Sequence, residues 1–466
     1  MKIDVLVAEI GSTTTVVNAF DAIDTPDPIF LGQGQAPTSV LKGDVTIGLK
    51  EATEDLKKNV SSNEINYRRF LATSSAAGGL KMTVHGLVYD MTVRAAKEAA
   101  LGAGANLHYV TAGKLRQSDI KKITEISPNI ILIAGGVDYG ERDTALHNAE
   151  MIAQLNLKVP IIYAGNVQNH DEIKEIFSKN EIALHIVENV YPKIDELNIE
   201  PTRKIIQDVF EAHIIHAPGM EKVREVVNGS IVPTPGAVMM ASQLLYSYLG
   251  DLVTFDVGGA TTDVHSVTEG SEEVTRILIS PEPKAKRTVE GDLGVYVNRK
   301  NIVSLIGVEK IGKAMAVSTE EIESMVAEFP PIPATEREVQ LVELLTETAV
   351  SVSLSRHAGR FRDLYSSAGK KKVAEGKDLT NIQYMVGTGG ALTRLPNRRQ
   401  IIENVIGKAK GHEMYPTKEA KILIDKSYIM ASLGVMSMEY PEAALHLLLK
   451  SLDVQPCERG GKCTQD

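Results

Sequence analysis

Apolar runs that end in a glycine-containing turn open the chain and recur in its middle. The stretch 3–10 is short and mostly apolar, which is typical of a buried strand. After a tight turn, partial alternation of apolar and polar positions over 14–20 predicts a returning strand. The same order of strand, turn and strand recurs over 255–264. The pattern therefore predicts two similar hairpins in distant parts of the chain.

The segments around these hairpins alternate between helical and extended periods. The spacing of their apolar residues predicts helices over 45–59, 92–103, 234–245 and 335–364, and strands over 70–74 and 382–386. The basic triplet Lys370-Lys371-Lys372 is expected in a solvated surface loop rather than in a site.

The order of predicted elements is different from residue 107 to residue 228. Strand, glycine-rich turn and helix follow one another there, as expected for βαβ units. Three continuous apolar runs, 129–136, 159–166 and 182–187, fit parallel strands that are covered on both faces. This segment is therefore expected to be an inserted Rossmann-like domain.

Composition narrows the classes of function. The 466 residues are 43% hydrophobic, enough for two or three cores. A net charge of -10 argues against broad binding to nucleic acid or to a membrane surface, because lysine and arginine drive such binding. The start of the chain lacks the uninterrupted apolar core of a signal peptide, so we expect a cytoplasmic protein. Cys457 and Cys463 lie in a polar tail and cannot supply the four ligands of a zinc site.

Both hairpins carry the residue types that bind phosphate. Each places an acid at the end of an apolar strand, then glycines that leave backbone N–H groups accessible, then hydroxyls. Magnesium bound to a nucleotide keeps several waters, so Glu9 and Asp256 are expected to hold it through water. The candidate nucleotide ligands are Gly11, Ser12, Thr13 and Thr14 in the first hairpin and Gly258, Gly259, Thr261 and Thr262 in the second.

A third glycine-rich turn, with Gly387, Thr388, Gly389 and Gly390, follows a strand and precedes a helix start. It is a candidate for close approach of the base and ribose to the backbone. Each turn alone is a weak signal, because most glycine turns after strands are only turns. The full order of two hairpins, a linker helix after the first, the third turn and a small-residue helix over 428–435 makes chance a poor explanation.

In this order of motifs the chain resembles the superfamily of actin, heat-shock chaperone ATPases, sugar kinases and hydantoinases. The resemblance implies a two-lobed α/β fold with ribonuclease H-like lobes, bound ATP and magnesium, and Asp256 and Glu9 as the catalytic acids. Most relatives have aspartate at the first position, and Glu9 is longer by one methylene group.

A narrower resemblance rests on 8–15, 133–138, 255–263 and 288–294. Together these segments look like the glutamate mutase accessory protein family, GlmL, whose members are often labelled MutL. The resemblance implies an ATP-dependent reactivating partner of an adenosylcobalamin-dependent mutase, such as glutamate mutase or an amino-acid aminomutase, that promotes release of damaged cobalamin. The expected units are 1–106 for the first lobe, 107–228 for the insertion, 229–250 for a connecting helix, 251–450 for the second lobe and 451–466 for the tail.

Alternatives remain open at this point. The fold would also serve a metabolite kinase of the sugar kinase or hydantoinase type, or a nucleotide-regulated binding module without turnover. Asp263 is expected to orient a hydroxyl or to cap a backbone group rather than to touch metal. Glu290 and Asp292 fit a metal or partner contact and a solvated turn equally well. The sequence does not name the mutase, and a homodimer is among the oligomeric states that it allows.

Overall fold

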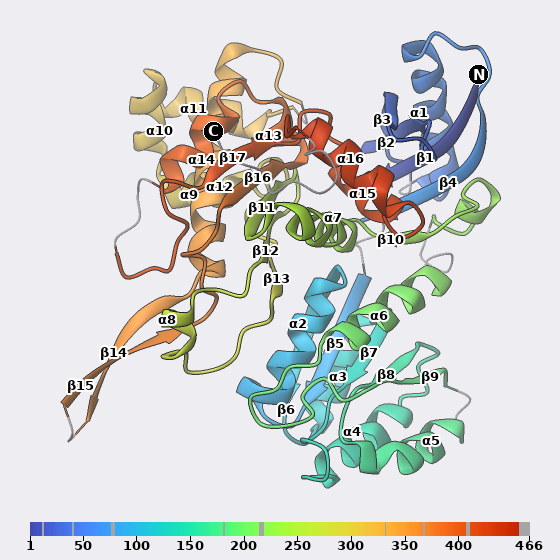
Figure 1. Ribbon diagram of the computed structural model, residues 1–466, viewed down its shortest axis with the longest axis vertical. Coiled ribbons are helices and arrows are strands. Elements are labelled where there is room, and N and C mark those ends of the chain that lie inside the picture. The colour runs from blue at the N-terminus through green and yellow to red at the C-terminus, as the bar shows by residue number, and fades with distance from the viewer. Residues whose placement is uncertain are drawn as a thin grey trace.

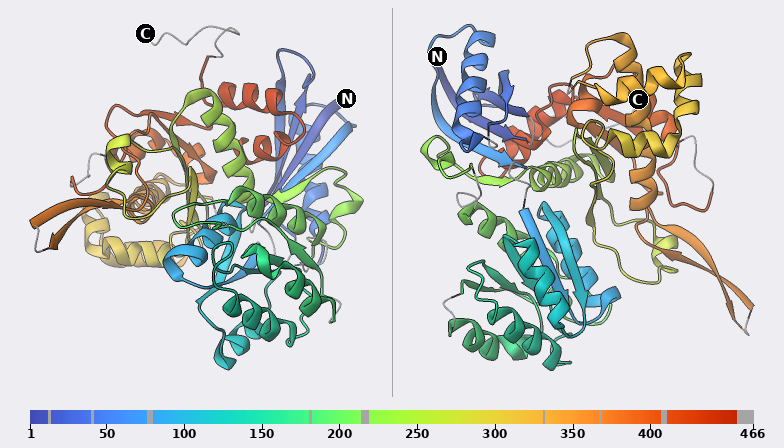
Figure 2. Two further views of the ribbon diagram at one scale, coloured as in Figure 1. Left: turned by 60° about the horizontal axis from the view of Figure 1, so that its bottom comes forward. Right: turned by 180° about the vertical axis from the view of Figure 1, so that it is seen from behind.

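The computed structural model describes residues 1–11, 14–39, 42–75, 80–179, 182–213, 219–330, 332–366, 369–406 and 411–455. Ser12, Thr13, Cys457 and Cys463 lie outside the described residues. Two lobes lie side by side, and a third unit lies beneath them (Figure 1). The view from behind shows the same arrangement (Figure 2).

The first lobe is built on a five-stranded sheet. Its strands are β1 (Lys2–Ile10), β2 (Thr14–Asp21), β3 (Ile29–Pro37), β4 (Asn66–Ser74) and β10 (Ile231–Pro233), in the order β10-β4-β1-β2-β3. Strand β1 is antiparallel to β2 and parallel to β4. Helix α1 (Val45–Asn59), as expected from its period, packs on β2 and β3. It begins at Asp44, whose carboxylate accepts the N–H of Thr46 at 2.9 Å.

The second lobe repeats this topology with an unrelated set of residues. Its strands are β11 (Leu252–Val257), β12 (Thr262–Val267), β13 (Ala285–Glu290), β16 (Tyr384–Thr388) and β17 (Lys421–Ile424), in the order β13-β12-β11-β16-β17. Its helices are α8 (Glu272–Thr275), α9 (Arg299–Ile306), α10 (Val308–Met315), α11 (Thr319–Ala327), α12 (Glu336–His357), α13 (Gly389–Arg394) and α14 (Arg398–Ile406). In both lobes a three-stranded antiparallel meander is extended by two parallel strands. The expected two-lobed, actin-like fold is confirmed.

The third unit is a parallel five-stranded sheet. Its strands are β5 (Leu80–Gly86), β6 (Ala105–Ala112), β7 (Ile130–Ile133), β8 (Ile161–Tyr163) and β9 (Leu184–Ile186), in the order β6-β5-β7-β8-β9. Its helices are the π-helix η3 (Tyr89–Val93), α2 (Arg94–Gly102), α3 (Gln117–Ile126), α4 (Asp143–Ala153), the 3-10 helix η4 (Val167–Asn169), α5 (His170–Ser178) and α6 (Glu200–His213). This is the expected Rossmann-like architecture.

The third unit takes in more of the chain than the sequence suggested. The expected boundary at residue 107 falls inside β6, and β5 pairs with both β6 and β7. Alternation of apolar Leu80, Met82 and Val84 with polar residues was the available signal for β5. We therefore propose that the inserted unit begins near residue 80.

Helices connect the lobes through their interface. They are α7 (Thr234–Leu249), α15 (Met430–Met436) and α16 (Pro441–Ser451), and they lie between the two sheets (Figure 1). Their apolar residues share one buried cluster with Val5 and Val7 of the first lobe and Leu252 and Val386 of the second. The angle between the lobes is therefore tied to the packing of these helices.

One predicted segment is wrong. Helix α12 ends at His357 rather than at residue 364, and β14 (Arg360–Ser366) pairs with β15 (Gly369–Glu375), which contains the lysine triplet expected in a loop. A side chain at Gly359 would lie 2.6 Å from the carbonyl oxygen of Glu375, so this close approach favours glycine where the helix stops. The hairpin projects from the second lobe (Figures 1 and 2), and its three lysines are exposed as expected. In the described part of the chain, no helix is both long and apolar enough to cross a bilayer.

Candidate functional site

A cavity of about 960 Å³ lies between the lobes and reaches the inserted unit. The predicted residues on its wall are Glu9, Gly11 and Thr14 from the first hairpin, Asp256, Gly258, Gly259 and Thr261 from the second, and Gly390 from the third turn. Glu9 is the next-to-last residue of β1 and Asp256 that of β11, and these are the equivalent central strands of the two sheets. The shared topology thus brings two acids, 247 positions apart in the sequence, to one cavity.

The remaining predicted residues have other places. Thr262 is buried and donates its hydroxyl to the carbonyl of Leu293 at 2.8 Å. The hydroxyl of Thr388 donates to Asp425 at 3.0 Å. Gly387 faces apolar side chains of β17 and α14 rather than the cavity. These residues support the wall of the cavity without lining it.

Gly389 has a role that the sequence did not suggest. Its φ of +83° is a left-handed conformation, and a side chain there would come within 2.5 Å of Oδ1 of Asp256. The third turn therefore lets β16 and α13 approach the Asp256 carboxylate closely.

Glu9 is almost fully buried, with 8% of its surface exposed. Its Oε1 accepts a hydrogen bond from the hydroxyl of Tyr428 at 2.9 Å, whereas Oε2 is buried without a partner among the described residues. Burial raises the pKa of Glu9 to about 7, although the Tyr428 hydrogen bond acts in the opposite direction. Burying a carboxylate oxygen without a hydrogen-bond partner lowers the stability of the fold. We therefore expect a ligand to contact this atom.

Asp256 is half-buried and lines the same cavity. Burial, together with the nearby carboxylates of Asp263 and Glu9, raises the pKa of Asp256 to about 8. A cation in the cavity would relieve this repulsion. The described residues hold no group of three or more His, Cys, Asp or Glu side chains able to bind a metal ion by themselves. Carboxylate oxygens such as those of Glu9 and Asp256 are the type of donor that magnesium prefers.

Comparisons with known proteins agree on the family. The family model described as MutL protein matches residues 5–452. Protein MutL from Clostridium tetanomorphum is 35% identical over 460 residues, covering 96% of this chain and 98% of that protein.

The chain belongs to the MutL protein family.

Solved structures show only distant likeness to this MutL-family protein. Nucleotide-free acetone carboxylase is 12% identical, with a TM-score of 0.42, over 93% of this chain and 70% of that chain. Nucleotide-free diol dehydratase-reactivating factor is 11% identical, with a TM-score of 0.39, over 94% of this chain and 100% of that chain. Component A of (R)-2-hydroxyglutaryl-CoA dehydratase from Acidaminococcus fermentans is 9% identical, with a TM-score of 0.29, over 96% and 99% of the two chains.

The MutL-family cavity has polar residues that sequence reasoning missed. Arg394, from the last turn of α13, donates to Oε1 of Gln35 on β3 at 3.0 Å and so crosses between the lobes. Its guanidinium lies 5.9 Å from the ring of Tyr428, and both residues line the cavity. Tyr428 begins the predicted small-residue segment, but no local pattern indicates its bond to Glu9, 419 positions away.

Other acids near the site are engaged with protein groups. Asp263 accepts the hydroxyl of Thr261 at 3.0 Å, as expected, and forms an ion pair with Arg287 at 2.6 Å. Glu290 and Asp292, for which a metal contact and a solvated turn were both open, bind the guanidinium of Arg356 at 2.5 and 2.8 Å. They join β13 to α12 and do not line the cavity.

The raised pKa values of Glu9 and Asp256 predict a pH-dependent stability. Both carboxyls bind a proton more tightly in the folded protein than in the unfolded chain, where their pKa values are about 4. Their contribution to stability is therefore complete below about pH 4 and is lost as pH rises through about 7 to 8. We expect the urea midpoint of the ligand-free protein to fall between pH 6 and 9.

The double variant Glu9→Gln with Asp256→Asn lacks both titrating groups and is the matched control. It should show a flatter profile over the same pH range, because its amides do not titrate. Equal slopes for the two proteins would contradict the assignment of the pH dependence to this pair.

Proposed function

We propose that this MutL-family protein binds ATP with magnesium in the cavity between its lobes, hydrolyses it, and uses the cycle to reactivate an adenosylcobalamin-dependent mutase. The observation that carries the nucleotide part is the convergence of Glu9 and Asp256, each at the end of the central strand of its lobe, on one cavity beside glycine turns. Buried acids with raised pKa values in a cleft are typical of functional sites.

The two turns supply the groups that would bind the phosphates. Gly11 and Thr14 approach from one lobe, and Gly258, Gly259 and Thr261 approach from the other. Backbone N–H groups in glycine turns bind anions without steric hindrance. Arg394 adds the positive charge that suits a triphosphate. Magnesium, when bound, would supply further positive charge to the phosphate oxygens and offset the charges of Glu9 and Asp256.

One wall of the cavity is apolar and suits a nucleoside. Tyr296, Phe329, Val342 and Leu395 line it, all from the second lobe. An apolar and aromatic wall beside a few polar groups is the usual composition of a small-molecule site. We therefore place the base against α12 and the start of the loop after α13, with the phosphates between the turns.

Asp256 is the proposed general base. Its carboxylate can accept a proton from a water that attacks the terminal phosphate, and a base whose pKa lies near the working pH is well matched to this task. Glu9, held by Tyr428, is the proposed second acid and would position water on the other side of the phosphates. Tyr428 fixes Oε1 of Glu9, and Oε2, which has no partner in the part of the chain that the structure describes, stays available to a ligand.

The proposed partner, an adenosylcobalamin-dependent mutase, is inferred from the family resemblance. The segments that place the chain near the glutamate mutase accessory proteins include both hairpins and the 133–138 turn of the inserted unit. A reactivating partner must change shape between its ATP and ADP states, because a ligand shifts a conformational equilibrium only by its difference in affinity for the two states. Two lobes joined through packed helices suit such a change.

The test is rescue of an inactivated enzyme. Candidate mutases, including glutamate mutase and an amino-acid aminomutase, are inactivated with cyanocobalamin and supplied with fresh adenosylcobalamin. We expect activity to return with this protein, ATP and magnesium, and not when ATP is replaced by ADP. ATP binding and hydrolysis without rescue of any mutase would remove the partner from the proposal while keeping the nucleotide site.

A further inference from the structure

The inserted unit forms part of the wall of the nucleotide cavity. Gly104 and Asn106, from the turn between α2 and β6 and the start of β6, line the same cavity as Asp256 and Thr261. This α2–β6 turn comprises residues 102–106. A ligand between the lobes would therefore lie beside the inserted unit and not only beside the two lobes.

A single buried side chain joins this turn to the second phosphate hairpin. Arg287 of β13 has 1% of its surface exposed. Its Nε and Nη2 lie 2.8 and 2.6 Å from Oδ1 of Asp263. Its Nη1 donates to the carbonyls of Leu101 and Ala105, at 3.0 and 3.1 Å. One rigid guanidinium thus holds a carboxylate of the second lobe and two carbonyls of the inserted unit.

The other end of this connection is the hairpin itself. Asp263 also accepts the hydroxyl of Thr261, and both residues line the cavity beside Asp256. Breaking a buried ion pair leaves an uncompensated charge, which is strongly unfavourable. A ligand that moves Thr261 or Asp263 would therefore move Arg287 with them rather than break the pair.

The α2–β6 turn is packed so that it cannot shift alone. Gly104 has a φ of +97°, and a side chain there would lie 2.7 Å from the N of Gly236, near the start of α7. Gly102 is similarly covered by the guanidinium of Arg203 on α6. A displacement of the turn would therefore be passed to α2, to α6 and to the connecting helix α7, because close-packed interiors transmit strain.

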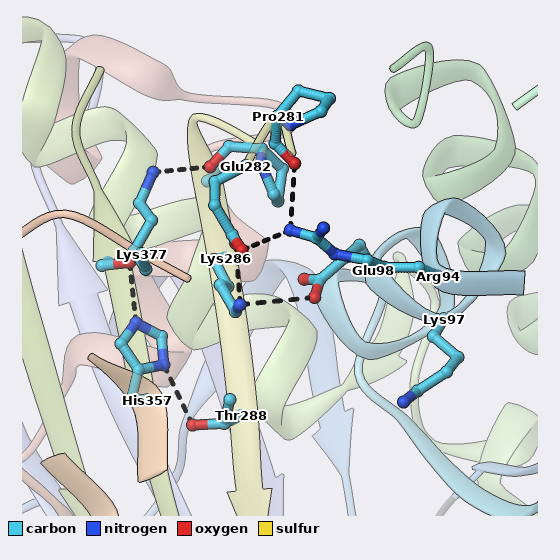
Figure 3. A network of polar contacts seen from close by, with 12 residues as sticks. Arg94, Lys97, Glu98, Pro281, Glu282, Lys286, Thr288, His357 and Lys377 are labelled. Atoms are coloured by element: carbon cyan, nitrogen blue, oxygen red, sulfur yellow. Dashed lines mark hydrogen bonds and ion pairs between the residues drawn. The ribbon is translucent and has the colours of Figure 1, made fainter. Parts of the chain in front are cut away.

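A second group of charges joins the same two units (Figure 3). Lys286, next to Arg287 on β13, lies 2.7 Å from Glu282 and 3.6 Å from Glu98 of α2. Arg94 of α2 also binds Glu282 and donates to the carbonyl of Pro281 at 3.0 Å. None of these residues lines the cavity, so this outer group fastens α2 to β13 without contacting a ligand.

We propose that Arg287 is a positioning residue that couples the state of the nucleotide in the cavity to the position of the inserted unit. The inference rests on the proposed nucleotide site. It goes beyond that site by naming the contacts through which the bound nucleotide would change the position of the inserted unit. The outer group keeps the two units together in every state. The contacts of Arg287 with Asp263 and with the α2–β6 turn transmit the structural difference between the ATP-bound and ADP-bound hairpin.

The test measures the response of the inserted unit directly. Hydrogen exchange of peptides that cover 94–112 is compared with magnesium-ATP and with magnesium-ADP, each at a concentration shown by calorimetry to saturate the protein used. We expect the wild-type difference to fall by more than half in Arg287→Lys. Lysine can keep the ion pair with Asp263 but lacks the planar fork that holds the carboxylate and both carbonyls at once.

Glu282→Gln is the matched control, because it weakens the outer group at the same interface and leaves Arg287 intact. It should keep the wild-type difference. An Arg287→Lys protein that binds ATP and retains the full difference would overturn the inference, as would an equal loss in Glu282→Gln. Loss of ATP binding in Arg287→Lys would also overturn it, since Arg287 would then be a binding residue. A wild-type protein that binds no ATP would instead defeat the proposed function on which the inference rests.

Should Arg287→Lys fail to fold, the double variant Asp263→Asn with Arg287→Gln replaces it. This pair removes both buried charges, so that neither is left uncompensated. The same loss of the exchange difference is expected, and a retained difference would count against the inference.

Discussion

Replacing Asp256 with asparagine is expected to reduce ATP hydrolysis by about 10²- to 10⁴-fold, the usual contribution of a general base. Asparagine has nearly the same shape and cannot accept the proton of the attacking water. Stability should stay equal or rise, because the change removes a carboxylate whose pKa burial and the charges of Asp263 and Glu9 have raised. Steady-state phosphate release and a urea titration at pH 8 measure the two effects.

Asp251→Asn is the control for this prediction. It removes a carboxylate just before β11, outside the cavity, so hydrolysis should be unchanged. If Asp256→Asn retained turnover within about threefold of wild type, Asp256 would not be the base. A matching loss of turnover and of stability would point to a damaged fold rather than to lost chemistry.

Adding one methyl group at Gly434 is expected to destabilise the whole protein. A Cβ there would lie 2.6 Å from the carbonyl carbon of Ala237, where α15 crosses α7. Overpacking of this kind typically lowers the free energy of unfolding by about 1–3 kcal/mol. Alanine is favoured over glycine in a helix by about 1 kcal/mol, which offsets only part of that cost. ATP affinity should also fall, because these two helices set the angle between the lobes.

Gly291→Ala provides the comparison, since no heavy atom of the described residues lies within 4 Å of a Cβ at that position. Its urea midpoint should remain close to that of the wild type. A Gly434→Ala protein as stable as Gly291→Ala, with unchanged ATP affinity, would show that the crossing can relax and that the helix contact does not control the lobes.

The two phosphate hairpins were predictable because their information is local. A strand that ends in an acid, followed by glycines and hydroxyls, specifies its turn within about ten residues. Helix α1 was likewise predicted at its observed bounds, because its hydrophobic period is a local signal. The end of α12 was missed because 335–364 was taken as one helical stretch, whereas the helix stops at His357 and the chain continues into the β14–β15 hairpin.

The polar contacts of the site could not be predicted from local sequence patterns. Tyr428 meets Glu9 across 419 positions, Arg394 meets Gln35 across 359, and Arg287 meets the carbonyl of Leu101 across 186. Gly389 lies against the carboxylate of Asp256, a contact that the sequence did not suggest. Each of these contacts depends on which strands become neighbours, and residue spacing does not encode that.

The sequence by itself therefore determined the two hairpins and the α/β class, because turn chemistry and hydrophobic period act over short stretches of chain. It indicated the family through the resemblance of its motifs. Only the tertiary structure decided that both acids share one cavity, that Oε2 of Glu9 has no partner among the described residues, and that the inserted unit reaches that cavity. The physical reason is that burial and long-range pairing set the pKa values and the contacts, and both exist only once the sheets have assembled.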